Sequence, residues 1–374
     1  IIDAFIERPK ATRYHWFIGA GFLILFTLNT FSLFHDPEVH AIQKELERKS
    51  AYLVIPLIAI LSHGKIKEMG KTALTAFYTG LILISIYMLG NAAIKTLHEP
   101  SLQYWTYHEL CGPFHTGAIY FSWYLAIAIL TIFWDGHHSI IKNLKYYFLG
   151  FFLLMLFLAV SKLFVLLVIP MLAIQYGKQL NRKQRLRSGF IALFFILGAS
   201  YPILDRLSEL KNTNLELVMQ DEYTYDSPFN GLTLRLFQWR MGFEILNDRD
   251  AWFKGTGVGS RQKVLDSYYK KYKVYTGNPE LGDRGYLGYN FHNQFVETTV
   301  GVGIIGLITL LVICGLVLFF PGKELFFPLT GIIISIAFLL TESVLQRQAG
   351  VMLFALLSTL LYNASSALPK KPVT

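Results

Sequence analysis

The chain has 374 residues, of which 53% are hydrophobic and only 16% are charged, against roughly 25% charged in ordinary soluble domains. This composition argues against a soluble domain and predicts an all-α, polytopic membrane protein. The formal net charge of +9 does not indicate a nucleic-acid partner, because the basic residues gather in short connectors, where they act as topology signals. The two cysteines, Cys111 and Cys314, do not define a disulfide framework, since Cys314 falls inside an apolar stretch.

About ten stretches are apolar and long enough to cross a hydrocarbon core of about 30 Å, with some of them short or tilted. They cover residues 14–34, 51–62, 72–94, 116–134, 146–161, 163–176, 188–204, 297–320, 326–341 and 349–363. The stretch 51–62 has to recruit polar residues at its N-terminal end or tilt. Because the chain starts at Ile1 rather than Met and shows no signal peptide, helices ahead of Ile1 would be missing from this count.

The basic connectors predict how the chain is oriented. If Arg8, Lys10 and Arg13 lie in the cytoplasm, alternation of the spans places the other basic connectors on the same side. The long insert then faces the periplasm of a bacterial inner membrane. The expected organisation is an N-terminal set of transmembrane helices over 1–204, a large periplasmic loop domain over 205–296, and C-terminal transmembrane helices over 297–374.

The insert shows its own local patterns. Apolar and aromatic residues at helical spacing predict a helix over 232–247, with Thr233 as a possible cap. A turn rich in glycine follows at 254–259, then a helix over 264–272 and an irregular loop over 273–289. After the insert, the small residues Gly301, Gly303 and Gly306 predict close packing between membrane helices.

Arg235 and His292 are the residue types that an anionic, lipid-linked substrate requires. An imidazole with an unperturbed pKa of about 6.5 can accept a proton from a hydroxyl near neutral pH, and His292 stands where the insert meets an apolar span. Arg235 keeps its charge and can bind phosphate oxygens bidentately. Lys162 and Arg347 stand at span ends on the same outer side, where a charge is costly. Snorkelling, or a pairing of Glu342 with Arg347, is the structural alternative.

Three weaker patterns argue for other chemistry. Gly255, Gly257 and Gly259 have the spacing of a phosphate-binding loop, but no strand precedes them, so a tight turn is favoured. Asp248-Arg249-Asp250 has the acidic spacing of metal-dependent sugar-nucleotide transferases, but without a nucleotide fold a solvated helix end is favoured. His137-His138 is a minor candidate for metal binding. We therefore expect neither a metal nor a cofactor.

Four motifs occur in a recognisable order: Arg235-x-x-x-Trp239, Lys254-Gly-Thr-Gly257-Val-Gly259, His292-Asn293-Gln294 and Gly301-x-Gly303-x-x-Gly306. This series resembles the O-antigen ligase and polymerase superfamily of bacterial inner membrane proteins, and the resemblance runs from about His115 to the end of the chain. Ser161-Lys162 looks like the family's Ser-Arg pair, with a lysine that keeps the charge but loses the guanidinium fork. Residues 115–120 and 342–350 are similar to motifs of one branch of the family.

The resemblance implies a GT-C-type bundle of about twelve transmembrane helices, so two would precede Ile1. It also implies an inverting, metal-independent glycosyltransferase without a cofactor, which moves O-antigen glycan from undecaprenyl diphosphate to lipid A-core in lipopolysaccharide assembly. In that scheme His292 activates the acceptor. The other implied site residues are Arg235, Lys162 and Arg347 on the diphosphate, with Asn293, Trp239, Arg240 and Glu342 in support.

Two alternatives stay open. An O-antigen polymerase uses the same donor and a second lipid-linked repeat as acceptor; the compact His292-Asn293-Gln294 signature and the single large insert favour a ligase. A transporter of lipid-linked sugars is the alternative from another class. Transport sites usually lie near the bilayer midplane between internal repeats, whereas these candidates gather at one surface and no repeat is evident. The expected partners are the donor, the acceptor and membrane lipids.

Overall fold

The computed structural model describes residues 13–62, 66–114, 117–132, 144–177, 214–278, 280, 282–319 and 326–361. Within these ranges the regular structure is helical and no strand occurs, which confirms the all-α class. Several expected features lie outside the described residues: His115, His137-His138, the basic connector 178–187 and the span 188–204.

The chain divides into two compact units, each built from segments distant in the sequence. The first unit comprises residues 1–63, 207–320 and 336–359. The second comprises residues 64–206, 321–335 and 360–374. The insert thus folds as part of a unit that also contains membrane-type helices. The division into three consecutive domains at residues 204 and 296 stays a prediction.

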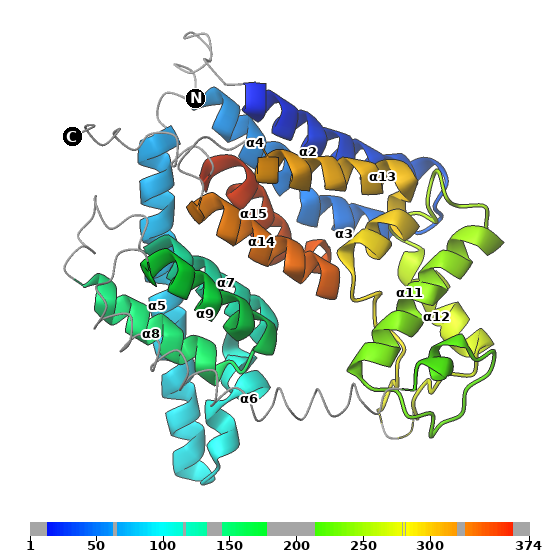
Figure 1. Cartoon of the computed structure of the whole chain (residues 1–374). Helices are drawn as coiled ribbons and strands as arrows, with labels where there is room; N and C mark the ends of the chain where they lie inside the picture. Colours follow the sequence, from blue (N-terminus) through cyan, green and yellow to red (C-terminus); the bar gives the residue numbers. More distant parts are fainter. Residues whose placement is uncertain are drawn as a thin grey trace. The chain divides into compact units, whose positions relative to one another are not determined.

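In the first unit, helices pack around α2 (Arg13–Phe31). The others are α3 (Val39–Lys49), α4 (Ala51–Leu61), α13 (Gln294–Phe319) and α15 (Gln348–Leu356). α2 lies against α4 and α13, and α15 lies against α4 (Figure 1). Ile18 and Phe22 of α2 are fully buried in this packing, whereas Trp16 and Phe17 are more than half exposed. An apolar face that stays exposed is suited to contact with lipid.

The insert adds η6 (Leu215–Met219), α11 (Gly231–Asp248) and α12 (Arg261–Lys271) to the first unit. α11 matches the helix predicted over 232–247. Its cap is Asn230, whose side chain accepts from the backbone of Leu232 and Thr233. Thr233 completes a capping box by accepting from the Asn230 backbone N–H, so it is the third helical residue rather than the cap. An aromatic core that includes Phe237, Tyr269, Phe291 and Val300 joins α11 and α12 to the start of α13.

The second unit contains α5 (Ile66–His98), α7 (Ala118–Ile132), α8 (Lys145–Leu158) and α9 (Lys162–Gly177). The short helices η3 (Leu102–Trp105), α6 (Tyr107–Cys111) and η4 (Gly112–Phe114) connect α5 to α7. α7 packs against α5, α8 and α9. α14 (Phe326–Thr341) has its residues up to Ser335 in this unit and the remainder in the first.

Three helical stretches are long and apolar enough to cross a membrane: Arg13–Phe34, Thr72–His98 and Gln294–Phe319. The pair Tyr107–Phe114 and Ala118–Ile132, bent by 80°, would make a fourth. Shorter apolar helices are Tyr146–Leu158, Leu163–Ala173, Thr330–Thr341 and Gln348–Thr359. Every expected span within the described residues therefore contains a helix, but only three or four reach crossing length. The count of about ten spans stays a prediction.

A break in α13 brings the glycine-rich turn against this helix. Gly303 has φ 78° and ψ −175°, which interrupts the helical hydrogen bonds. The backbone of the turn fills the gap: Ile304 N–H donates to the carbonyl of Trp252 (2.7 Å), and Thr256 N–H donates to the carbonyl of Val300 (2.7 Å). A Cβ on Gly303 would overlap the carbonyl of Phe253. The absence of a side chain at Gly303 therefore lets the glycine-rich turn approach α13, whereas the sequence predicted the approach of a neighbouring membrane helix.

Candidate functional site

His292 lies where the insert meets α13, in a backbone conformation that non-glycine residues rarely adopt. Its φ is 44°, in the left-handed region, and its N–H donates to Oδ1 of Asn290 (2.9 Å). The next residue, Asn293, is buried and caps α13: its Oδ1 accepts from the N–H of Phe295 (2.9 Å) and of Val296 (3.2 Å). Local polar contacts therefore fix the backbone that presents His292.

Trp239 supports the same backbone from α11. Its indole Nε1–H donates to the carbonyl of Phe291 (3.0 Å), the residue before His292. The Phe291 side chain is itself buried in the aromatic core of the insert. The position of His292 is thus tied to α11 as well as to α13.

Glu342 is the partner of the His292 ring. Its Oε2 lies 2.9 Å from Nδ1 of His292, and its Oε1 lies 3.2 Å from Nη2 of Arg235. Burial by itself raises the pKa of Glu342, but the hydrogen bond and charge of His292 and the charge of Arg235 outweigh burial, so the pKa is lowered. An ionised carboxylate only accepts hydrogen bonds, so Nδ1 carries the hydrogen; when the ring is neutral, Nε2 carries the lone pair.

Arg235 stands one turn into α11 and binds three different acceptors. Nη1 donates to the carbonyl of Gly231 (2.8 Å), Nη2 to Glu342 (3.2 Å), and Nε to the carbonyl of Thr341 at a longer 3.4 Å. A guanidinium has five N–H donors, so two remain after these contacts with described residues. Its side chain is 33% exposed. Arg235 can therefore orient Glu342 and still donate to an anionic ligand.

The charges of this cluster define its chemistry. With a neutral imidazole, the charges of Arg235 and Glu342 cancel; when His292 takes up a proton, one net positive charge remains. A carboxylate on Nδ1 stabilises the imidazolium, which is the arrangement of a general base that holds a proton during a reaction. Among the residues the structure describes, no group of three or more His, Cys, Asp or Glu side chains is placed to hold a metal ion.

Arg240 and Arg347 have surroundings of their own in the first unit, and Lys162 belongs to the second unit. Arg240 binds Glu244 (2.6 Å) and the carbonyls of Val218 (2.9 Å) and Gln220 (2.7 Å), so it joins η6 to α11. Arg347 is exposed and stands at the N-terminus of α15. Lys162 begins α9 in the second unit. The contacts thus unite His292, Glu342 and Arg235, with Asn293 and Trp239 holding the backbone.

The glycine-rich turn binds a carboxylate of the chain itself. Oδ2 of Asp36 accepts from the N–H of Gly259 (2.7 Å) and of Ser260 (3.0 Å), and Oδ1 accepts from the Ser260 hydroxyl (2.5 Å). A Cβ on Gly257 would overlap Asp36. The tight turn favoured from sequence is therefore present. Asp36 and backbone or hydroxyl oxygens of the chain accept from its N–H groups, which are thus not open to a phosphate.

The acidic pair at the end of α11 also has contacts of its own. Oδ2 of Asp248 accepts from the hydroxyl of Tyr268 (2.7 Å) and from Lys271 (3.3 Å). These contacts join the end of α11 to α12.

Two buried charged residues near the cluster were not identified from the sequence. Glu297, one turn into α13, is 2% exposed and pairs with Arg261, which is 7% exposed. A carboxylate at the start of an apolar span was a usable signal, because such a charge is costly without a partner. Arg261 offered no comparable signal, since it follows a turn in a polar segment.

Comparison with known proteins gives one match. Residues 146–311 match the family model described as O-Antigen ligase. The matched segment contains Lys162, Arg235 and His292 and ends before Glu342. A search of curated proteins finds no match to the chain.

Proposed function

We propose that this chain, a member of the O-antigen ligase superfamily, is an inverting glycosyltransferase in which His292 is the general base. The family comprises ligases and polymerases, and its substrates are lipid-linked glycans. The observation that carries the proposal is the cluster of His292, just before α13, Glu342, just after α14, and Arg235 on α11. It combines a base, a carboxylate that stabilises its protonated form, and a permanent cation for a phosphate group.

The geometry supports a single displacement. The oxygen of the acceptor hydroxyl attacks the anomeric carbon of the donor sugar while the bond from that carbon to the diphosphate oxygen breaks. The hydroxyl proton goes to Nε2 of His292, which becomes a positively charged imidazolium. The negative charge of Glu342 compensates this positive charge. The diphosphate leaves with the bonding electrons, and the N–H groups of Arg235 stabilise it. Attack opposite to the leaving group inverts the anomeric configuration.

We assign undecaprenyl diphosphate as the donor carrier and lipid A-core as the acceptor, so that the protein is an O-antigen ligase of the bacterial inner membrane with its site facing the periplasm. The compact His292-Asn293-Gln294 signature and the single large insert support ligase over polymerase. The assay incubates purified protein with labelled undecaprenyl-diphosphate glycan and lipid A-core. Transfer of label to lipid A-core is expected; growth of the lipid-linked chain alone would make the protein a polymerase.

The matched variant is His292→Ala. Removal of a general base typically costs about 10²- to 10⁴-fold in rate, so turnover should fall by that factor while the donor still binds, because Arg235 remains. Donor binding is followed by the quenching of tryptophan fluorescence or by a filter assay. Full turnover in this variant would contradict the proposed mechanism. If the parent transfers no glycan, and parent and variant move the lipid-linked sugar across proteoliposomes at the same rate, a transporter is favoured.

A further inference from the structure

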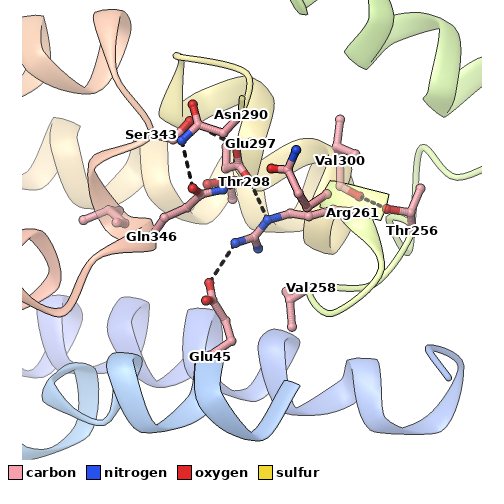
Figure 2. Close-up of polar contacts among 12 residues, drawn as sticks. Glu45, Thr256, Val258, Arg261, Asn290, Glu297, Thr298, Val300, Ser343 and Gln346 are labelled. Carbon is pink, nitrogen blue, oxygen red and sulfur yellow. Dashed lines mark hydrogen bonds and ion pairs between the residues drawn. The ribbon is translucent and has the colours of Figure 1, made fainter. Parts of the chain in front are cut away.

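A buried chain of charges lies directly behind the candidate site. Arg261 of α12 stands between two carboxylates: its Nη2 lies 3.0 Å from Oε1 of Glu45 in α3, and its Nε pairs with Oε1 of Glu297 in α13 (Figure 2). Lys49 pairs with the same oxygen of Glu45 (2.9 Å) and donates to Asn29 of α2 (2.7 Å). All five side chains are buried. Four helices, from the N-terminal part of the chain and from the insert and the helix that follows it, therefore meet at one set of charges.

Stability does not explain why these charges are buried. Taking ions out of water costs about as much as their attraction returns, and apolar replacements of a buried ion cluster are often neutral or stabilising. What such a cluster does provide is a defined geometry, because each partner is satisfied in only one arrangement. The question is then which geometry this cluster fixes.

One side of Glu297 fixes the segment that follows Glu342. Oε2 of Glu297 accepts from the hydroxyl of Ser343 (3.0 Å), and Oε1 accepts from Nε2 of Gln346. Beside it, Oε1 of Gln294 accepts from the N–H of Leu345 (2.6 Å). Residues 343–346 are thus held against the first turn of α13. Since Ser343 adjoins Glu342, these contacts set where the Glu342 carboxylate lies.

The same carboxylate also reaches the backbone of His292. Oε1 of Gln346 accepts from Nδ2 of Asn290 (2.9 Å), and Oδ1 of Asn290 accepts from the N–H of His292 (2.9 Å). Figure 2 shows Asn290, Gln346 and Ser343 gathered around Glu297. A closed circuit therefore runs from His292 through Asn290, Gln346 and Glu297 to the Glu342 segment and back across the 2.9 Å contact of the pair.

We propose that Glu297, anchored by Arg261, is a positioning residue that sets the geometry of the His292–Glu342 pair. The inference rests on the proposed function, since it concerns the pair to which that function assigns the base. Glu297 acts on the side chains of His292 and Glu342 indirectly, through hydrogen bonds that involve Ser343, Gln346 and Asn290. Its effect is expected in the chemical step, because misplacement of a catalytic group by about 1 Å can cost about 10²-fold in rate.

The test is a double-mutant cycle on turnover. Glu297→Gln keeps the side-chain size but removes the charge that anchors Arg261 and one of the two acceptors. We expect kcat to fall by about 10- to 100-fold while KM for the donor changes by less than about threefold. In a Glu342→Gln background, the same substitution should have little further effect, because the pair is already broken. Losses that multiply in the double variant would overturn the inference.

Glu45→Gln is the matched control. It removes the other carboxylate bound to Arg261 and is equally buried, but the polar contacts of Glu45 are with Arg48, Lys49 and Arg261. We expect it to lower the unfolding temperature at least as much as Glu297→Gln, with kcat within about threefold of the parent at a temperature where both are folded. An equal loss of kcat in the two variants would assign Glu297 to stability alone and refute a positioning role.

A second variant covers the case in which Glu297→Gln does not fold. Gln346→Met cuts the link between Glu297 and Asn290, leaves the ion pairs intact, and replaces a side chain that is only partly buried. A fall in kcat with unchanged KM supports the inference, and unchanged kcat contradicts it. The two proposals remain separable. A fully active His292→Ala variant refutes the proposed function. An inactive His292→Ala variant, combined with losses that multiply in the Glu297→Gln, Glu342→Gln double variant, refutes only the role of Glu297.

Discussion

At the scale of single residues, His292 combines backbone strain with candidate chemistry. Its φ of 44° is rarely adopted by residues with a large side chain, and such conformations persist where the surroundings determine them. Here the surroundings are the bonds from Asn290 to its N–H and from Trp239 to the preceding carbonyl. The strained residue is also the one whose ring meets Glu342, so strain and site coincide.

The first residue-scale prediction compares two cations. Arg235→Gln removes a charge that holds Glu342 and, in the proposed function, the diphosphate, so kcat/KM for the donor should fall by about 10²-fold or more. Lys162→Arg keeps the positive charge and should stay within about threefold of the parent. Steady-state kinetics with the lipid-linked donor measures both. Equal losses would mean that Lys162 is required for its shape rather than its charge.

The second residue-scale prediction concerns how the stability of the fold changes at acidic pH. Burial raises the pKa of Glu45, but the charges of Lys49 and Arg261 outweigh it and bring the pKa from 4.5 to about 2. A carboxyl group with a depressed pKa stabilises the fold above its unfolded pKa, and this contribution is lost as the pH falls through the folded value. The stability difference between the parent and Glu45→Gln should therefore be largest above pH 4.5 and shrink toward pH 2.

Denaturant unfolding in detergent, followed at several acidic pH values, measures that difference. A constant difference from neutral pH down to about pH 2 would show that Glu45 titrates in the folded protein as it does in the unfolded chain. Glu38→Gln is a suitable control, because this carboxylate pairs with Lys263 near the surface. Exposed ion pairs contribute little to stability, so the control should show only a small change with pH.

At the scale of elements, periodicity predicted the helices well and their junctions less well. α11 begins and ends within one residue of the predicted helix, because apolar side chains at helical spacing report which face is buried. Thr233 was the possible cap from sequence, whereas the structure has Asn230 as the cap. Both residue types can cap a helix, and only geometry shows which side chain accepts. Gly303 was identified as a site of close approach, but the sequence does not reveal which segment approaches.

The docking of the turn on α13 gives an element-scale prediction. Gly303→Ala adds a Cβ that overlaps the Phe253 carbonyl and forces a residue with φ of 78° to leave the glycine region. We expect a loss of stability on the order of 3 kcal/mol, comparable with other strained or overpacked positions. Gly315→Ala is the control in the same helix, where a Cβ meets nothing within 4 Å; there, alanine should be neutral or stabilising.

Thermal unfolding of both variants in the same detergent tests this prediction. The Gly303 variant should also lose transferase activity, because α13 carries Glu297 and the cap that presents His292. If Gly303→Ala unfolds at the parental temperature, then the turn does not depend on glycine at this position.

At the scale of the whole molecule, local sequence patterns could not show which charges meet. Arg235, His292 and Glu342 were each recognisable by type and place, but the contacts that join them span 50 and 107 residues. The sequence left open a pairing of Glu342 with Arg347, its near neighbour, whereas the fold places the Glu342 carboxylate between His292 and Arg235. Position in the sequence favours near neighbours, and tertiary packing overrides it.

The last prediction concerns the source of positive charge for the diphosphate. In the proposed function the cation is supplied by side chains, so transfer activity should survive dialysis against EDTA, with a rate within about twofold of the untreated protein. The alternative is a divalent metal on the acidic pair Asp248 and Asp250, at the end of α11. In the structure, Asp248 is already bound to Tyr268 and Lys271, and a metal would have to displace the Lys271 ammonium.

Asp250→Asn separates the two schemes, because Asp250 belongs to the acidic pair and not to the His292 cluster. In the side-chain scheme this variant and the chelated parent both keep their activity. In the metal scheme both lose it, and magnesium restores only the parent, since a carboxamide is a weaker ligand for a hard cation than a carboxylate is. Loss on chelation followed by magnesium rescue would thus move donor binding from Arg235 to the far end of α11, and the site would have to be redrawn around that helix end.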